Sequence, residues 1–454
     1  MEQAIAAIST ATAPGGIGII RISGENASLI ADRVFKGMGG KTIENLEGYQ
    51  ALYGHIVGEE GVVDEAIALK FAAPKSYTGE EVVELSCHGG LAVMKETLSL
   101  VLSAGARPAG PGEFTRRAFM NGKMTLTQAE AVMDIISAKG KEAARAAVAA
   151  REGALAKKMA KTEEELTNVA AWLGAWADFP EEEIPEVDGP ALLSRLTPAM
   201  NVLTNLINDF ESGRILREGI ETVIAGCPNV GKSTLMNYLC GYQSSIVTPI
   251  AGTTRDVVSQ EIMLGDYRLH LSDTAGIRQT ADTVEQFGVQ RAKDCLETAS
   301  LIFAVFDSSR PLNAEDMELM RLCEGRKAVA IINKSDLESQ TNWQEIQKHF
   351  AYTVFLSAKQ EEGRDQLTDA ITHLFAMDDF DGTDGFLCNT RQLDCATRAK
   401  TALQECMDAI EMNLTLDAVS VSLDGCLEAL FELSGKRVTE EVTDGVFHQF
   451  CVGK

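Results

Sequence analysis

The chain has 454 residues, and at roughly 150 residues per domain this length predicts about two to four domains. Hydrophobic residues make up 45% and charged residues 24%, a composition that excludes a disordered, collagen-like or membrane protein. The 41 Lys and Arg residues stand against 66 Asp and Glu residues, a formal net charge of −25, so most of the surface should repel nucleic acid. Any contact with RNA must therefore be local or shared with a partner.

The first residues, Met1 to Ile5, lead directly into a strand-like pattern, so no targeting signal is expected. The N-terminus has neither a basic segment with a long apolar run nor an Arg- and Ser-rich transit segment. The ten cysteines contain no C-x-x-C pair, and no histidine lies at a zinc-ligand spacing from them. We expect a cytoplasmic protein without a membrane anchor, a disulfide framework or a structural metal.

Residues 1–118 alternate between strand-like and helix-like patterns, which predicts an α+β domain. The predicted strands lie at 17–22, 50–57, 65–71 and 81–85, and the predicted helices lie at 26–35 and 91–102.

Alanine and other strong helix formers dominate the next part of the chain. Gly140 and Gly153 are expected to break or bend the helical run. The helical pattern returns near the C-terminus, so we predict one discontinuous helical bundle made of two pieces. Its predicted helices lie at 127–139, 142–176, 192–211, 391–414 and 419–433.

Between these pieces, short apolar strands alternate with helical segments, which predicts a doubly wound parallel sheet in an inserted α/β domain. The predicted strands lie at 222–225, 268–271, 301–306, 328–332 and 353–356.

A phosphate-binding motif follows the first of these strands. Residues 226–233 read Gly-Cys-Pro-Asn-Val-Gly-Lys-Ser, which fits G-x-x-x-x-G-K-[ST] between a strand and a helix. Backbone N–H groups of such a loop bind phosphates, Lys232 reaches the β- and γ-phosphates, and Ser233 offers its hydroxyl to Mg²⁺. We therefore predict a Ras-like P-loop domain.

Four further motifs follow in order at strand ends and loops. Asp273-Thr274-Ala275-Gly276 suits the magnesium shell and the γ-phosphate, and Thr254 in 252–256 is the expected second magnesium ligand. In Asn333-Lys334-Ser335-Asp336, the carboxylate of Asp336 can accept two hydrogen bonds from guanine, which adenine cannot donate. Ser357-Ala358-Lys359 would close over the base. The nucleotide is therefore expected to be GTP.

Ile277 occupies the position where Ras-like proteins carry a water-orienting glutamine. Because isoleucine cannot orient water, hydrolysis needs a polar group from elsewhere. Glu285, within 278–288, is a candidate, although a single acid there is more often a solvated helix residue.

The whole chain resembles the bacterial tRNA modification GTPase family MnmE, also called TrmE. The resemblance is carried by the G-domain motifs, including 251–256 and 273–278, and more specifically by the two ends of the chain. The end motifs are 18–24 (GIIRISG), 76–80 (SYTGE), 88–90 (HGG), 111–119 (PGEFTRRAF) and the terminal FCVGK, close to the family's Cys-Ile-Gly-Lys ending.

This resemblance implies GTP hydrolysis coupled to the addition of a carboxymethylaminomethyl-type group at C5 of the wobble uridine of certain tRNAs. It implies a homodimer and a complex, as a heterotetramer, with the flavoprotein MnmG, which supplies FAD and uses NADH. It also implies four parts: 1–118, a tetrahydrofolate-binding and dimerisation domain; 119–217, the first helical part; 218–379, the G domain; and 380–454, the second helical part.

The resemblance also implies the ligand sets. A tetrahydrofolate derivative (5-formyl or 5,10-methylene) would be bound by Arg21, Glu84, Lys123 and Lys454. K⁺ would be held by Asn229, Thr248, Ile250 and Thr253, Mg²⁺ by Ser233 and Thr254, and Glu285 would orient the attacking water. The residues expected to contact GTP are Asn229, Val230, Gly231, Lys232, Ser233, Thr234, Thr248, Pro249, Ile250, Ala251, Gly252, Thr253, Thr254, Asp273, Thr274, Ala275, Gly276, Asn333, Lys334, Asp336, Ser357, Ala358 and Lys359.

Several alternatives stay open at this point. Cys451 sits near a partly cationic terminus and is either a nucleophile or a bystander. A basic cluster in 139–161 either contacts tRNA phosphates or is a solvated helix face, the commoner case. Two other functions compete with this one: a ribosome-assembly GTPase, which would usually carry a basic RNA-binding domain, and a folate-dependent transferase with a vestigial G domain.

Overall fold

The computed structural model describes residues 3–178, 189–241, 259–273, 299–375, 377, 380–437, 439–448 and 450–453. The chain forms two compact units, the first of Met1–Met133 with Leu430–Lys454 and the second of Asp134–Ala429. In the described part of the chain, no helix has both the length and the apolarity needed to cross a membrane.

The first unit is built on a sheet of seven described strands in the order β3-β4-β5-β6-β2-β1-β7. Neighbouring strands run antiparallel except β1 and β7, and the register places Arg21 of β2 directly opposite Glu84 of β6. The predicted strands of 1–118 are confirmed. The strands are β1 (Ile5–Ile8), β2 (Gly15–Ser23), β3 (Phe35–Gly37), β4 (Gln50–Gly58), β5 (Gly61–Phe71), β6 (Val82–Gly89) and β7 (Arg107–Pro108).

The two faces of this sheet bear different layers. On one face, Ile20 and Leu85 pack with Ile30 of α1 (Ala27–Val34) and Met94 of α2 (Leu91–Ser103). On the other face, Ile5 and Ala7 pack with Phe114 of α3 (Glu113–Met120). The face under α3 also carries Arg21 and its register partner Glu84, so these two predicted folate residues share a side of the sheet with α3.

The sheet of the second unit has the described order β13-β12-β11-β8-β10-β9. The prediction of an all-parallel sheet was wrong for its edge, because β9 pairs antiparallel to β10 through a tight turn at 265–266. The strands are β8 (Ile220–Gly226), β9 (Ser259–Leu264), β10 (Tyr267–Asp273), β11 (Leu301–Asp307), β12 (Ala328–Asn333) and β13 (Tyr352–Phe355).

Helices cover both faces of this sheet, as a doubly wound fold requires. Every residue of β11 is buried; Val305 faces the core under α9 and α13, while Ala304 faces the core under α11 and α12. The parallel strands β8, β11, β12 and β13 therefore end at one shared edge. The helices are α9 (Lys232–Gly241), α11 (Ala314–Cys323), α12 (Trp343–Gln347) and α13 (Arg364–Leu374).

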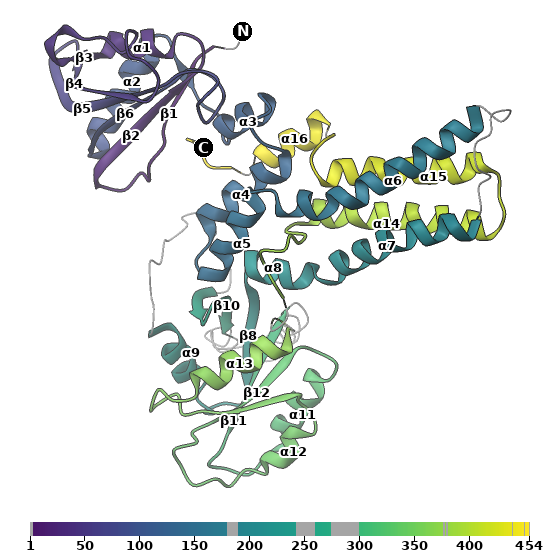
Figure 1. Ribbon diagram of the computed structural model, residues 1–454. Helices are drawn as coiled ribbons and strands as arrows, with labels where there is room; N and C mark the ends of the chain where they lie inside the picture. Colours follow the sequence, from purple (N-terminus) through teal and green to yellow (C-terminus); the bar gives the residue numbers. More distant parts are fainter. Residues whose placement is uncertain are drawn as a thin grey trace, which may run out of the picture. The chain divides into compact units, whose positions relative to one another are not determined.

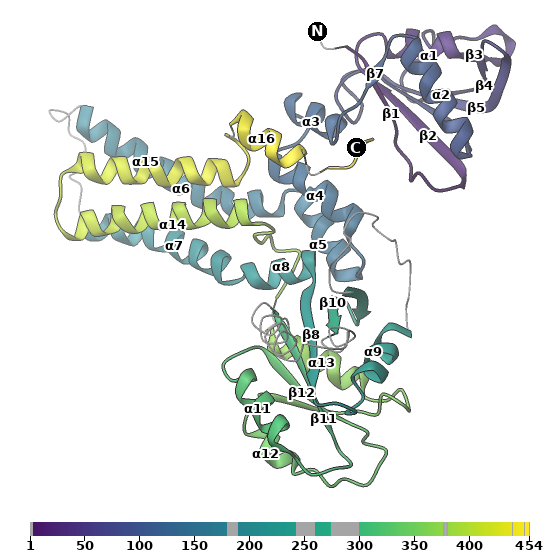
Figure 2. The same ribbon diagram turned by 180° about the vertical axis from the view of Figure 1, so that it is seen from behind.

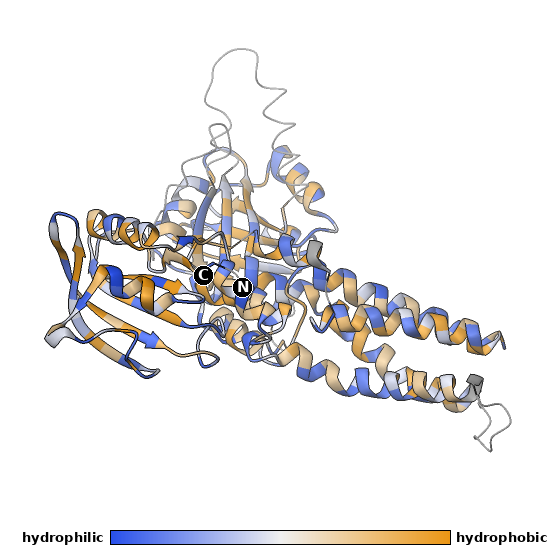
Figure 3. Cartoon of the chain, turned by 90° about the horizontal axis from the view of Figure 1, so that it is seen from above, coloured by the Kyte–Doolittle hydropathy of each residue, from blue (hydrophilic) through white to orange (hydrophobic). Residues whose placement is uncertain are grey.

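Long helices from before and after this sheet lie side by side: α14 runs along α7, and α6 also contacts α7 (Figures 1 and 2). Hydrophilic and hydrophobic residues alternate around them (Figure 3). The predicted helix over 142–176 is divided at Gly153, whose φ of +82° ends a helix. The helices are α4 (Leu126–Ser137), α5 (Lys141–Arg151), α6 (Ala154–Asp178), α7 (Gly189–Asn208), α8 (Phe210–Glu218), α14 (Thr390–Glu411), α15 (Leu416–Leu433) and, in the first unit, α16 (Glu440–Phe447).

Candidate functional site

The P-loop, 226–233, joins the end of β8 to the start of α9. Gly231 has a φ of +98°, and a Cβ there would lie 2.3 Å from Nδ2 of Asn333. Both the backbone conformation and the available space therefore require glycine at this position. The backbone can then turn its N–H groups toward an anion at the N-terminus of α9.

Asn333, at the end of β12, holds the P-loop at the end of β8; β11 lies between these two strands. Its side chain is buried, its Nδ2 donates to the carbonyl of Val230 at 2.8 Å, and its Oδ1 accepts from the N–H of Ala358 at 3.1 Å. One amide thus joins the phosphate loop to the 357–359 segment. The structure thus brings together three predicted motifs, 226–233, 333–336 and 357–359.

Lys334, next to Asn333 and partly exposed, also holds the P-loop. Its Nζ donates to the carbonyl of Asn229 at 3.0 Å and to Oδ2 of Asp307 at 2.6 Å. Burial raises the pKa of Asp307, but hydrogen bonds from Lys334 and Ser309 outweigh it and hold the pKa below its ordinary value. Asp307 was not predicted, although it ends β11 as Asn333 ends β12.

Asp336 presents its carboxylate at the surface, where a base would be recognised. The buried hydroxyl of Ser357 donates to its Oδ1 at 2.6 Å. The N–H of Gln360 in turn donates to that hydroxyl at 3.2 Å. Asp336 is therefore fixed in orientation by a segment that Asn333 also anchors, and Lys359 is exposed beside it.

Lys232 lies folded back over the loop. Its Nζ donates to the carbonyls of Gly226 and Cys227, both at 2.8 Å. Ser233 and Thr234 are exposed in the first turn of α9. The ammonium therefore lies against the P-loop, and the serine hydroxyl lies at the first turn of α9, which follows it.

Cys227 of the same loop is a buried thiol. Its Sγ donates to the buried Asp316 at 2.9 Å. Burial, followed by this hydrogen bond, raises the pKa of the thiol to about 12. The thiolate is therefore scarce at neutral pH, and Cys227 acts as a structural contact between the loop and α11.

Part of the predicted nucleotide site lies outside the described residues. Asp273 ends β10 opposite Ile224 of β8, but its side chain is not among those described. The others outside the described residues are Thr248, Pro249, Ile250, Ala251, Gly252, Thr253, Thr254, Thr274, Ala275, Gly276 and Glu285.

A second polar site lies under α3 in the first unit. Nε of Arg21 donates to Oε1 of Glu84 at 2.8 Å. The guanidinium lies 5.5 Å from the ring centroids of both Tyr77 and Phe114. We call Arg21, Glu84 and Tyr77 the Arg21 cluster. A half-buried cation and carboxylate beside a tyrosine ring can bind a planar ligand that has N–H groups and a carboxylate.

Of the other two predicted folate residues, Lys123 is described and Lys454 is not. Nζ of Lys123 donates to the carbonyl of Pro74 at 3.0 Å, at the start of the segment that carries Tyr77. Lys454 lies outside the described residues, but the tail before it is docked: Val452 bridges to Pro111, and Ser9 Oγ donates to the carbonyl of Gly453 at 3.1 Å. Cys451 is exposed within this tail.

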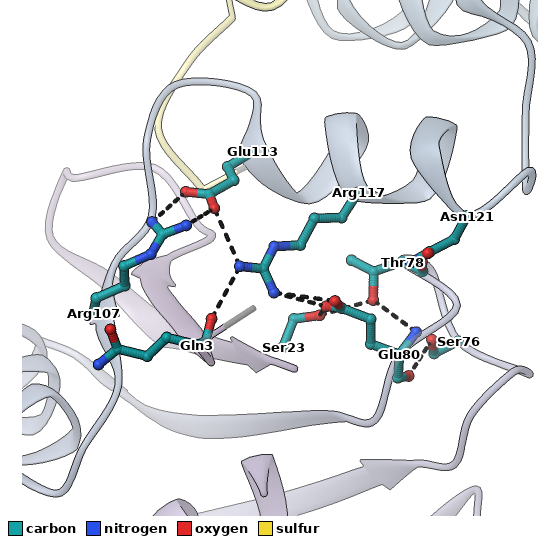
Figure 4. A network of polar contacts seen from close by, with 9 residues as sticks. All are labelled: Gln3, Ser23, Ser76, Thr78, Glu80, Arg107, Glu113, Arg117 and Asn121. Carbon is teal, nitrogen blue, oxygen red and sulfur yellow. Dashed lines mark hydrogen bonds and ion pairs between the residues drawn. The ribbon is translucent and has the colours of Figure 1, made fainter. Parts of the chain in front are cut away.

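A buried network fixes the segment 76–80 that carries Tyr77 (Figure 4). Arg117 of α3 donates to both carboxylate oxygens of Glu80 at 3.1 Å, to the carbonyl of Gln3 at 3.0 Å and to Glu113 at 3.3 Å. The hydroxyl of Ser23 donates to Glu80 at 2.7 Å. The sequence motifs containing Glu80 and Arg117 were noted without roles, since their pairing across 37 residues has no local signal.

Comparison with known proteins covers the whole chain. Residues 126–451 match the MnmE helical domain, and residues 4–123 match the GTP-binding protein TrmE N-terminus. The chain is 39% identical over 457 residues to a tRNA modification GTPase MnmE of Clostridioides difficile, with 100% of each covered. Proteins of the same name are 40% identical in Alkaliphilus oremlandii, with 100% of each covered, and 40% identical in Bacillus subtilis, with 99% of each covered.

Proposed function

The chain belongs to the tRNA modification GTPase MnmE (TrmE) family, and from this premise we propose that it couples GTP hydrolysis to modification of the wobble uridine of tRNA. As a member of this family it is a GTP-hydrolysing enzyme of tRNA modification. The finer proposal is the addition, together with the flavoprotein MnmG, of a carboxymethylaminomethyl-type group at C5 of that uridine.

The observation that carries the proposal is the buried Asn333, which joins the P-loop to the segment that orients Asp336. A vestigial G domain would not need this alignment of phosphate loop and base-recognising carboxylate. Lys232 would bind the β- and γ-phosphates, and Asp336 would select guanine over adenine. The glycine required at 231 leaves room for Asn333 to hold the P-loop.

Two cations would complete the nucleotide site. The exposed Ser233, with Thr254, would hold Mg²⁺, and the exposed Asn229, with Thr248, Ile250 and Thr253, would hold K⁺. These ions supply positive charge where negative charge develops between the β- and γ-phosphates. Glu285 would orient water in place of the glutamine that Ile277 replaces.

The Arg21 cluster would hold a tetrahydrofolate derivative, 5-formyl or 5,10-methylene, with Lys123 and Lys454. The fit rests on the chemistry of the donors: a guanidinium and an ammonium suit the carboxylate tail, while Glu84 and the Tyr77 ring suit the pterin. Bound folate would supply the one-carbon unit, and FAD and NADH would act through the partner.

The proposed organisation is a cytoplasmic homodimer that forms a heterotetramer with MnmG. We propose a folate-binding and dimerisation domain (1–118), a helical domain in two pieces (119–217 and 380–454) and a G domain (218–379) inserted between them. The packing of α14 along α7 supports the insertion, since the two helices precede and follow the G domain in sequence.

Nucleoside analysis of tRNA from a deletion strain tests the function. We expect C5-modified wobble uridines to disappear and to return when the wild-type chain is expressed. Unchanged tRNA together with abnormal ribosomal subunits would instead support a ribosome-assembly GTPase.

The potassium mechanism has a separate test. We expect turnover of GTP at least about tenfold faster in potassium than in sodium salts at matched ionic strength, because the proposed site places K⁺ where negative charge develops in the transition state. Asn229→Ala should lose this difference, and Glu285→Ala should lose hydrolysis while keeping nucleotide binding. Equal wild-type turnover in both salts would refute the cation mechanism.

A further inference from the structure

The segment 139–161, at α5 and the start of α6, carries a positive charge that the rest of the chain lacks. It contains seven Lys and Arg residues and two Glu residues, a net charge of +5. The rest of the chain has 34 Lys and Arg against 64 Asp and Glu residues. A polyanion that approaches this protein is therefore repelled by most of its surface and attracted to this segment.

The positive side chains line an open groove with a volume of about 770 Å³. Its basic lining residues are Lys141, Arg145, Lys157 and Lys158, and its acidic lining residues are Glu152 and Asp384. The groove exists because α5 and α6 meet at a glycine turn, and because the 382–385 segment packs against the first turn of α6.

Three of these cations reach the surface. Lys141, Arg145 and Lys157 are exposed, and Lys161, one turn after Lys157 on the same helix face, is exposed as well. Lys158 instead braces the groove wall: its Nζ donates to Asp384 Oδ2 at 2.9 Å and to the carbonyl of Gly385 at 3.1 Å. Arg145 also contacts Glu142 at 3.0 Å, an exposed pair that contributes little and is readily exchanged for another anion.

We propose that this groove binds the sugar–phosphate backbone of tRNA. The inference rests on the proposed function, since it takes tRNA as the substrate, and it adds the surface that holds it. The lining favours RNA over a protein partner: among the described lining residues none is aromatic, and Val148 is the only large apolar side chain exposed there. Protein interfaces depend on buried aromatic and Arg anchors, whereas phosphates need spaced cations on a small-residue floor.

The test is the salt dependence of tRNA binding by the full chain. The variant Lys141→Gln/Arg145→Gln/Lys157→Gln removes three cations from the groove. The control Lys95→Gln/Arg321→Gln/Lys348→Gln removes three exposed cations elsewhere, and its Arg321 has an i,i+3 Glu partner as Arg145 has. An unmodified tRNA transcript is titrated from about 50 to 200 mM salt, with the thermal unfolding midpoint confirming that each variant folds.

For the groove variant we expect the Kd to rise about 10- to 100-fold, and the slope of log Kd against log salt to fall by about 2 to 3, because each phosphate contact releases counterions. The control should match the wild-type chain. Unchanged tRNA binding by the groove variant would overturn the proposal, and unchanged tRNA binding with lost flavoprotein association would assign the groove to the partner protein. If either of these outcomes is found while the wild-type chain still modifies tRNA in cells, only the groove assignment fails. If the wild-type chain modifies no tRNA in cells, the proposed function fails as well.

Discussion

The P-loop would bind phosphates mainly through backbone N–H groups, whereas the Arg21 cluster would bind folate through side chains. The loop is shaped by a glycine with positive φ and anchored by Asn333 and Lys334. The Arg21 cluster is held by an ion pair across two strands and by Arg117, which binds Glu80 in the segment that carries Tyr77. A backbone site should fail when one atom is added, and a side-chain site should fail when one charge or contact is removed.

The largest expected effect is at Gly231. Gly231→Ala should lower GTP affinity more than about 100-fold, because its Cβ would meet Asn333 Nδ2 at 2.3 Å and displace the anchor of the loop. Gly325→Ala is the matched control: its φ of +73° gives similar backbone strain, but nothing lies within 4 Å of the new Cβ. Titration with a fluorescent GTP analogue measures both. Equal losses in the two variants would show that strain, and not the loop's anchor, is responsible.

The C-terminal tail gives the corresponding test of the folate side. Deletion of 451–454 should abolish tRNA modification in cells while GTP affinity stays within about twofold, because the tail's contacts are with Pro111, Gly112 and Ser9 of the first unit. Val452→Ala should leave modification intact, since the tail is held through backbone groups. Normal modification by the truncated chain would remove the tail from the folate site.

Nucleotide choice is expected to change by an intermediate amount. Asp336→Asn replaces a charged acceptor with an amide that is half donor, so GTP affinity should fall about 10- to 100-fold and xanthine nucleotides should be favoured relative to GTP. Ser357→Ala should cost only about 2- to 10-fold, since it frees the carboxylate without removing it. Competition between GTP and XTP measures the preference, and an unchanged preference in Asp336→Asn would place the base elsewhere.

The smallest effect concerns the pH dependence of the first unit. Burial raises the pKa of Glu113. Hydrogen bonds from Arg107 and Gly110 and the charge of Arg117 outweigh this effect, so the pKa lies below its ordinary value of 4.5. A lowered folded-state pKa gives stability that is fully present above pH 4.5 and is lost as the pH falls through the folded-state pKa.

Hydrogen exchange of α3 amides, corrected for intrinsic exchange rates, should therefore accelerate as the pH falls from 4.5 through the folded-state pKa of Glu113. In Glu113→Gln the free energy of opening of α3 should be about 1–3 kcal/mol lower, so its amides should exchange fast already at pH 7. The exchange of this variant should also depend less on pH. Glu318→Gln is the control, because it removes a carboxylate from an exposed ion pair with Arg321 on α11. If α3 exchange in wild type and Glu113→Gln responds identically to pH, the network does not depend on this carboxylate.

The sequence predicts the two sites to different depths for a physical reason. The P-loop, the 333–336 motif and the strands that carry them follow from local spacing, and the structure places them at one strand edge. Asp307, the antiparallel β9 and the Arg117–Glu80 pair were missed, because each depends on which distant segments the fold brings together. Arg21 and Glu84 were identified through the family alone; their pairing follows from the β2–β6 register, which no local pattern encodes.

The central claim is that GTP turnover in one unit drives a modification whose one-carbon donor binds in the other. The most direct measurement is nucleoside analysis of tRNA from the deletion strain carrying wild-type chain, Lys232→Ala or Arg21→Ala, each expressed at equal level. We predict that only the wild-type chain restores C5-modified wobble uridine, while Arg21→Ala still hydrolyses GTP and Lys232→Ala does not. Restoration of the modified uridine by Lys232→Ala would contradict the account.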